Sequence, residues 1–213
     1  MAERAAWLPG PGVIAGVLLL FGASSFGDTP DTRDTTAQVA RYFTTNRTTV
    51  LVGCVLVGLG LLAVLAVCAR MTSQLDSAGQ RSIARFTQGC GSLVVTVMLV
   101  TVVLINAGLS YVIGDEVPDM AKGLFELTLV ATPIVSLALA GFVGGVALGL
   151  HRAGMGRRWF VILSTAMAVG HVVGAASFAR SGPFSPDVQQ QVYLMSFVVW
   201  LLVSGRGVRS RDT

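Results

Sequence analysis

The chain has 213 residues, of which 53% are hydrophobic and only 12% are charged, about half the charged share of an average soluble domain. Its net charge is +4, but the basic residues are scattered singly, which argues against the gathered basic patch of a nucleic-acid-binding protein. Because a bilayer-crossing helix needs roughly 20 mostly apolar residues, the composition predicts one all-α membrane domain covering residues 1–213.

Six apolar stretches, separated by short polar segments, are predicted to span the membrane. They cover about 11–26, 48–69, 92–113, 123–150, 159–178 and 186–205. The last stretch opens with Ser185 as a capping residue and Pro186 at the first helical position. The fourth contains Pro133, which cannot donate a hydrogen bond to the Leu129 carbonyl and should kink the helix. A cleaved secretory signal is the alternative interpretation of the first stretch.

The distribution of lysine and arginine predicts the orientation of these spans. With the N-terminus in the cytoplasm, ten basic residues fall on the cytoplasmic side and five on the outside. The acidic residues are divided the other way, with three of eleven inside. The excess of basic residues in short cytoplasmic loops therefore predicts six spans in the inner (plasma) membrane, with both termini cytoplasmic.

The outer segment between the first two spans is predicted to contain a short amphipathic helix. Asp34 is the expected cap, and Val39, Tyr42 and Phe43 share one face of this helix. Such a helix would lie among the lipid headgroups, either as an interfacial anchor or as a lid over a cavity that opens outward.

The cytoplasmic segment 70–91 is predicted to be an amphipathic surface loop. Its apolar side chains, Ile83 and Phe86, oppose Arg81 and Arg85. Basic side chains near the bilayer surface are attracted to anionic lipids, so membrane lipids are expected partners of this segment.

Small residues recur every four positions on the fourth and fifth spans. They are Gly141, Gly145 and Gly149 on the fourth span, and Ala166, Gly170 and Gly174 on the fifth. Small residues at this spacing let two helix backbones approach closely. The pattern predicts that these two consecutive helices pack along the two stripes, and a glycine-lined channel is the alternative.

Polar residues at similar depth form the sharpest candidate site. The candidate ligand-binding residues are Asn106, Ser110, Glu126, His171 and Tyr193, with Ser196 nearby. All fall in the outer half of the predicted bilayer, Asn106 and His171 at a depth of about 10 Å. An ionisable residue inside a membrane suggests a functional site. The alternative is that His171 and Asn106 simply fasten the bundle, by bonding each other or a carbonyl freed near Pro133.

The sequence contains no complete motif for catalysis, metal binding or a cofactor. Cys54, Cys68 and Cys90 do not form a Cys-x-x-Cys motif and are expected to be packing residues. His151 and His171 lie some 18 Å apart along the membrane normal in the predicted topology, so they cannot ligate one metal or haem. An enzyme would need an acid and a base facing each other, which only Glu126 and His171 could supply.

Two segments resemble those of uncharacterised bacterial multi-pass membrane families. One is Asp34-Thr35-Thr36-Ala37, leading through Tyr42–Arg47 into a long apolar helix, and the other runs from Gly149 to Trp159. The last helix, with Trp200 and an arginine-rich tail, is similar too. These families usually have a proline near the position of Gly156, which this chain lacks. The resemblance implies a six-helix bundle of unknown function and transfers no site residues.

Two functions follow as hypotheses from these observations. The first is a non-catalytic partner or accessory subunit of another protein in the inner membrane, since packing stripes are frequent and catalytic motifs are missing. The second is a small carrier or binding protein for a lipophilic or proton-coupled molecule, with its site among the polar residues of the outer half. No cofactor, metal or nucleic acid is expected in either case.

Overall fold

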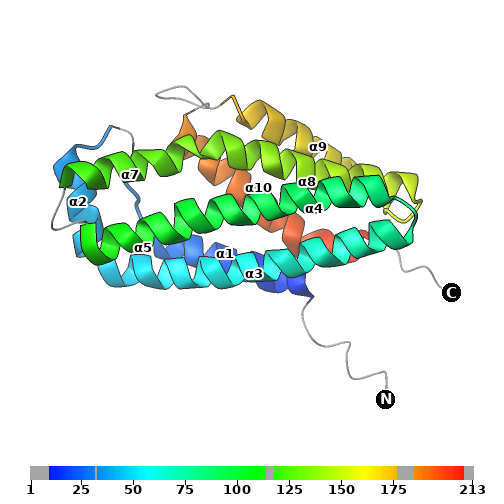
Figure 1. The fold of residues 1–213 in the computed structure, drawn as a ribbon, viewed down its shortest axis with the longest axis horizontal. Coiled ribbons are helices and arrows are strands. Elements are labelled where there is room, and N and C mark those ends of the chain that lie inside the picture. Colours follow the sequence, from blue (N-terminus) through cyan, green and yellow to red (C-terminus); the bar gives the residue numbers. More distant parts are fainter. Residues whose placement is uncertain (1–9, 32, 114–117, 177–184, 209–213) are drawn as a thin grey trace, which may run out of the picture.

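The structure, a computed structural model, describes residues 10–31, 33–113, 118–176 and 185–208, which form a bundle of helices (Figure 1). In chain order these are α1 (Pro11–Ser25), α2 (Thr36–Thr45), α3 (Arg47–Ser77), α4 (Arg81–Met98), the π-helix η2 (Leu99–Ile105), α5 (Asn106–Gly108), the π-helix η3 (Leu109–Ile113), α7 (Pro118–Val130), α8 (Thr132–Arg152), α9 (Arg158–Gly174) and α10 (Pro186–Gly207). Most run roughly along the long axis, whereas α2 lies across one end, here called the α2 end. The opposite end, with the α3–α4 and α8–α9 turns, is called the hairpin end.

Among the described residues, four helical stretches are long and apolar enough to cross a membrane. They are Arg47–Ser77, Arg81–Tyr111, Met120–Arg152 and Val188–Gly207. The predicted all-α class is confirmed, and each of the six predicted apolar stretches contains a helix. However, α1 and α9 have only 15 and 17 residues, fewer than the roughly 20 that a perpendicular span needs. α9 ends at Gly174, and the predicted end of the fifth stretch at about 178 lies outside the described residues.

Segment 70–91, predicted to be an amphipathic connection between two spans, forms a helical hairpin. α3 continues to Ser77, and α4 begins at Arg81. Gly79 has a positive φ of 80° in the turn between them, a conformation that glycine adopts without steric cost. The amide of Gln80 donates to the Leu75 carbonyl at 2.9 Å and closes the end of α3. The two helices therefore continue past their apolar sections.

The predicted amphipathic helix of the outer segment is α2, but its cap is Thr35 and not Asp34. Thr35 and Gln38 form a reciprocal capping box, in which the backbone amide of Gln38 donates to Thr35 Oγ1 at 3.3 Å. Val39 and Phe43 are buried, as the predicted apolar face requires. The Asp34 carboxylate instead accepts from the amide of Asp31 at 2.8 Å.

The predicted distortion near Pro133 is confirmed as a break between two helices. α7 ends at Val130, and α8 begins at Thr132 with Pro133 in its first turn. Proline is tolerated there because the first amides of a helix have no intrahelical acceptor.

The glycine stripe of α8 packs against the α3–α4 hairpin and not against α9. Side chains of the hairpin occupy the space next to each glycine: Cys90 beside Gly141, Thr87 beside Gly145, and Leu75 with Ile83 beside Gly149. On α9, Gly170 is exposed with open space where a Cβ would lie, and Ala166 is also exposed. The predicted pairing of the two stripes is therefore wrong, although α8 and α9 do pack together through other residues, such as Gly144 against Ala168.

Helix α1 is wedged between α3 and α10 through glycines that the sequence analysis did not single out. A Cβ on Gly22 would lie 2.8 Å from Val57 Cγ2 and 2.9 Å from the Val57 backbone nitrogen. Toward the hairpin end, Gly12 and Gly16 lie against the backbone and side chains of α10. The first and last helices of the described chain are therefore in direct contact.

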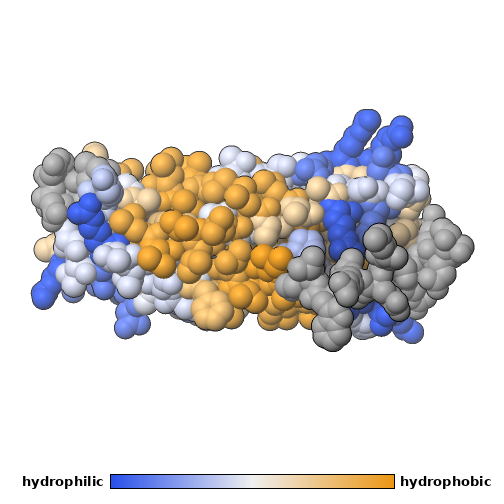
Figure 2. All heavy atoms as spheres, turned by 90° about the horizontal axis from the view of Figure 1, so that it is seen from below, coloured by the Kyte–Doolittle hydropathy of each residue, from blue (hydrophilic) through white to orange (hydrophobic). Residues whose placement is uncertain are grey.

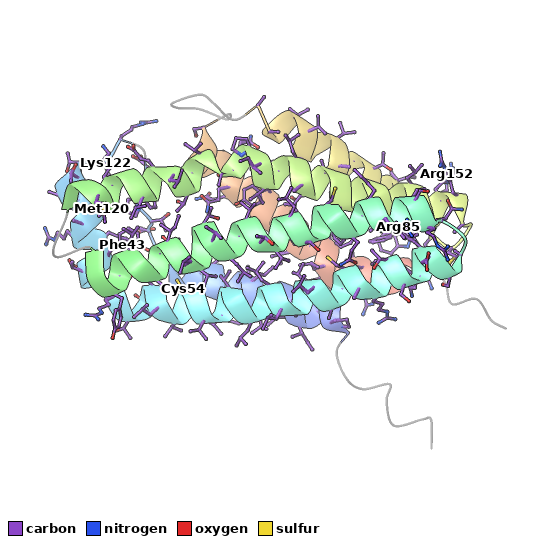
Figure 3. All side chains as sticks on the ribbon, viewed as in Figure 1. Phe43, Cys54, Arg85, Met120, Lys122 and Arg152 are labelled. Atoms are coloured by element: carbon purple, nitrogen blue, oxygen red, sulfur yellow. The ribbon has the colours of Figure 1, made fainter. Side chains whose placement is uncertain are left out.

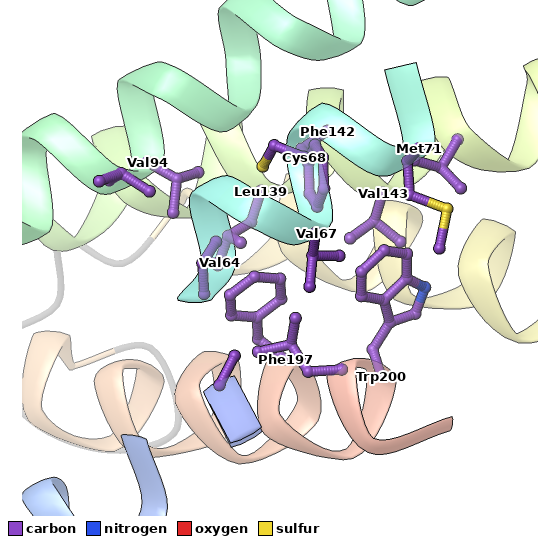
Figure 4. Close-up of a cluster of buried hydrophobic side chains, with 14 of the residues drawn as sticks. Val64, Val67, Cys68, Met71, Val94, Leu139, Phe142, Val143, Phe197 and Trp200 are labelled. Carbon is purple, nitrogen blue, oxygen red and sulfur yellow. The ribbon is translucent and has the colours of Figure 1, made fainter. Parts of the chain in front are cut away.

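An aromatic cluster fills the core between α8, α9 and α10 (Figure 4). The Trp200 ring lies 5.5 Å from that of Phe142, 5.6 Å from that of Phe160 and 6.1 Å from that of Phe197. The indole Nε1 donates to Ser164 Oγ at 2.8 Å, which satisfies the one polar atom of this buried side chain.

Hydrophilic side chains gather toward the two ends of the molecule. Figure 2 shows a broad apolar band across the middle of one face, with hydrophilic residues on either side of it. In Figure 3, Arg85 and Arg152 lie at the hairpin end, whereas Lys122 lies at the α2 end. Large apolar side chains such as Leu62, Leu104 and Ile162 are exposed on the surface of the bundle, as expected for a surface that faces lipid.

We expect Gly22→Ala to destabilise the protein by about 1–3 kcal/mol, because the new methyl group would press on the backbone of α3. The matched control is Gly170→Ala, where open space should keep the change within about 0.5 kcal/mol. Thermal unfolding in detergent measures both. Equal losses of stability would show that the assignment of packing faces is wrong.

Candidate functional site

The candidate functional site is a cavity of about 370 Å³ in the half of the bundle toward the α2 end. Its walls come from α1, the loop that follows α1, α3, α4 with η2 and α5, α7, and α10. The described residues that line it are Leu19, Ala23, Ser24, Phe26, Gly27, Thr29, Pro30, Asp31, Val57, Met98, Val102, Asn106, Phe125, Thr128, Leu129, Gln190, Gln191, Tyr193, Leu194 and Met195.

The lining changes from polar to apolar along the bundle axis. The loop after α1 contributes Thr29 and Asp31, and the beginning of α10 contributes Gln190 and Gln191. Farther toward the hairpin end the walls are aliphatic, with Val57 ten residues into α3, which corresponds to a depth of about 15 Å. A molecule with a small polar end and an apolar body matches this gradient.

Asn106 lines the cavity and is held by its own helix. Its Nδ2 donates to the carbonyl of Val102 at 2.9 Å and to that of Thr101 at 3.2 Å. Both acceptors belong to η2, where the wider π-helical turn changes the usual hydrogen-bond pattern. Cys54 Sγ also approaches the Val102 carbonyl, at 3.7 Å. The amide therefore satisfies backbone oxygens in an apolar wall, and it makes no hydrogen bond to His171.

His171 faces the interior, as predicted, but it does not line the cavity. Its side chain is buried, and Nε2 has no hydrogen-bond partner in the described part of the chain. Helices α9 and α10 run antiparallel, with Ser164 in contact with Trp200 and Gly174 in contact with Gln189. This register places His171 at the level of Tyr193. Tyr193 is buried and lines the cavity.

The remaining predicted site residues lie outside the cavity lining. Glu126 is half exposed, and Oε1 lies 3.6 Å from Lys122 Nζ, so this pair forms a surface ion pair. Ser110 is buried, and its hydroxyl has no partner among the described residues. Ser196 donates to the Tyr193 carbonyl. The structure thus brings Asn106 and Tyr193 together in one cavity and leaves His171, Glu126 and Ser110 apart from it.

Helix α2 holds the loop that forms part of the cavity wall. The Tyr42 hydroxyl donates to the Phe26 carbonyl at 2.6 Å, and burial raises the pKa of Tyr42 to about 12. On the other side of α2, Lys122 Nζ donates to the Asp34 carbonyl at 2.9 Å. These bonds tie the loop and α2 to the bundle, although no residue of α2 itself is among the described residues that line the cavity.

The described residues include no group of three or more histidine, cysteine or acidic side chains that could hold a metal ion. Cys54, Cys68 and Cys90 are free thiols: Cys54 and Cys68 are buried, and Cys90 is half-buried against Gly141. Among the described residues that line the cavity, no acid faces a histidine, the pairing that the enzymatic interpretation required.

Comparison with known proteins gives no relative of this chain. No protein-family model matches it, and neither a curated protein nor a solved structure is significantly similar to it. The interpretation of the site therefore depends on its geometry.

Several lining residues carry no signal that sequence analysis could use. Phe125, Leu129 and Leu194 are ordinary apolar residues of membrane helices, and only the relative positions of α1, α7 and α10 bring them together. Gln190 and Gln191 were the available signal, since they belong to a run of three consecutive glutamines, 189–191, and such a run is unusual near the start of an apolar helix.

We expect Asn106→Leu to lower the free energy of unfolding by about 1–2 kcal/mol, because two carbonyl oxygens of η2 would lose their donor. Ser110→Ala is the control one turn away, and its effect should be near zero because this hydroxyl makes no hydrogen bond within the described chain. Thermal unfolding in detergent compares the two. A larger effect at Ser110 would contradict the assignment.

Proposed function

We propose that this protein is an integral membrane protein of the inner membrane, with six spans and cytoplasmic termini, that binds a small lipophilic molecule in the cavity between α1, α7 and α10. The cavity is the single observation that carries the binding proposal. Its volume of about 370 Å³ falls in the range of small-molecule sites, and its lining combines apolar walls with a few polar groups.

The positions of α1 and α9 in the bundle support the proposal that both helices span the membrane. α1 packs along α3, and α9 packs along α8, so both lie beside helices long enough to cross. At about 22 Å and 25 Å they are shorter than the hydrocarbon core, and local thinning of the bilayer or flanking polar residues can accommodate such a mismatch. The excess of arginine at the hairpin end supports a cytoplasmic location for that end.

Cysteine labelling tests this topology. In a cysteine-free background, we expect Thr45→Cys at the end of α2 to react with a membrane-impermeant maleimide in intact spheroplasts. Ser77→Cys, at the α3–α4 turn, should react only after permeabilisation. Both residues are exposed, so burial does not account for a difference between them. The reverse pattern would invert the orientation.

The cavity favours ligand binding over the other functional hypotheses. Glu126 pairs with Lys122 and does not line the cavity, and neither does His171, so these two residues give no support to an enzyme or to a proton-coupled site. The hypothesis of an accessory subunit stays a prediction, which co-purification in mild detergent would test. The apolar walls of the cavity favour the binding of an apolar molecule, because binding removes the apolar surface of that molecule from contact with water or headgroups.

We expect the neutral fluorophore N-phenyl-1-naphthylamine to raise the melting temperature of the protein in lipid nanodiscs. Leu194→Trp should weaken binding about tenfold, because the larger ring occupies space that the probe would fill. Val192→Trp, on the exposed face of the same helix, is the matched control and should leave the affinity unchanged. Equal affinities in the two variants would place the probe outside the cavity.

A further inference from the structure

The cavity has one charged side chain in its described lining, and this side chain is an acid. Asp31 is the only aspartate, glutamate, lysine, arginine or histidine among the described residues that line it. Its Oδ1 accepts from the amide of Arg33 at 2.6 Å, which fixes the carboxylate in the loop after α1. No basic side chain of the described chain lies within 4 Å of this carboxylate, so its charge is not neutralised by an ion pair there.

Three aromatic rings share the lining with Asp31. Phe125 and Tyr193 are buried, and Phe26 belongs to the same loop region as Asp31. The faces of aromatic rings attract cations, and aromatic cages are a common way of binding quaternary ammonium groups. A carboxylate together with aromatic rings is therefore the side-chain chemistry that recognises a lipophilic cation.

The surrounding charges do not favour a ligand of either sign. Among the side chains that the structure describes at the α2 end, four are acidic (Asp28, Asp31, Asp34 and Glu126) and four are basic (Arg33, Arg41, Arg47 and Lys122). The last turn of α1 and the beginning of α10 both reach the cavity, so their opposite helix dipoles offset each other. The carboxylate of Asp31 is then the charge that decides which ligands are favoured.

From these contacts we infer that the ligand of the cavity is a lipophilic cation, such as an amphiphilic amine or quaternary ammonium compound, with its charged group near Asp31 and its apolar body among the aliphatic walls. This inference deepens the proposed function and rests on it. A lipophilic anion is disfavoured, because the described lining offers it no positive charge and places a carboxylate near its polar end.

Two probes of nearly the same shape separate the effect of charge from that of the apolar chain. Decyltrimethylammonium is a cation, whereas decyldimethylamine oxide is uncharged at pH 8. We expect the cation to bind the wild-type protein in nanodiscs about tenfold more tightly, as measured from the rise in melting temperature with probe concentration.

Asp31→Asn should abolish this preference, so that both probes bind with the affinity of the amine oxide, and Asp31→Glu should retain most of it. Asp28→Asn, an exposed position outside the lining, removes the same charge from the α2 end and should leave the preference intact. The retained preference in Asp28→Asn would exclude a general effect of surface charge.

The outcomes distinguish the two proposals. Equal affinities of the two probes for the wild-type protein, or a preference that survives Asp31→Asn, would overturn the inference of a cationic ligand and leave the cavity as a site for neutral molecules. If neither probe nor the naphthylamine stabilised the wild-type protein, the proposed binding function itself would fail.

Discussion

Close contact between helix backbones across glycine is the interaction on which this bundle depends. In a lipid environment apolar burial gives little drive for helices to associate, so van der Waals packing at short distance has to supply it. Here Gly12 and Gly16 bring α1 against α10, and Gly22 brings it against α3. Toward the α2 end, Leu19 and Ala23 of α1 line the cavity. The same helix, α1, therefore carries the packing glycines and contributes residues to the cavity wall.

Asn106 shows how the interior satisfies polar groups without water. A π-helical stretch such as η2 departs from the regular hydrogen bonds of an α-helix, and a carbonyl without a donor is costly in an apolar wall. The Asn106 amide donates to two of these carbonyls, and the Cys54 thiol approaches one of them. The irregular backbone of the cavity wall is thus stabilised by these bonds. As a consequence, the polar side chain of Asn106 lies beside the apolar part of the cavity.

Much of the fold could be predicted from the sequence because its signals are local. Apolar length locates the helices, Pro133 marks the break between α7 and α8, and apolar residues that share one helical face (Val39, Tyr42 and Phe43) locate α2. The choice of helix neighbours could not be predicted in this way. The glycines of α8 were expected to face α9 because the two helices are consecutive, yet they face Thr87 and Cys90 of α4. A four-residue spacing identifies a packing face but carries no information about its partner.

The candidate site was predicted only in part for the same reason. Asn106 and Tyr193 were recognised because polar groups are rare at that depth, but depth alone does not say which side of a helix they occupy. His171 proved to be buried away from the cavity lining. Asp31 escaped notice because a single aspartate in a polar loop resembles any solvated residue until the loop is seen to form a wall.

The contact between α1 and α10 has a consequence for biogenesis. Helix α1 is synthesised long before α10, and until α10 follows, the glycine-bearing surface of α1 at Gly12 and Gly16 has no partner from that helix. A backbone bond from the Arg157 amide to the Gly207 carbonyl, at 2.9 Å, likewise forms only when the end of α10 is in place. The packing of α1 and the bond of Arg157 are therefore completed only after α10 has been synthesised, and a nascent chain stalled before α10 would hold an incomplete bundle.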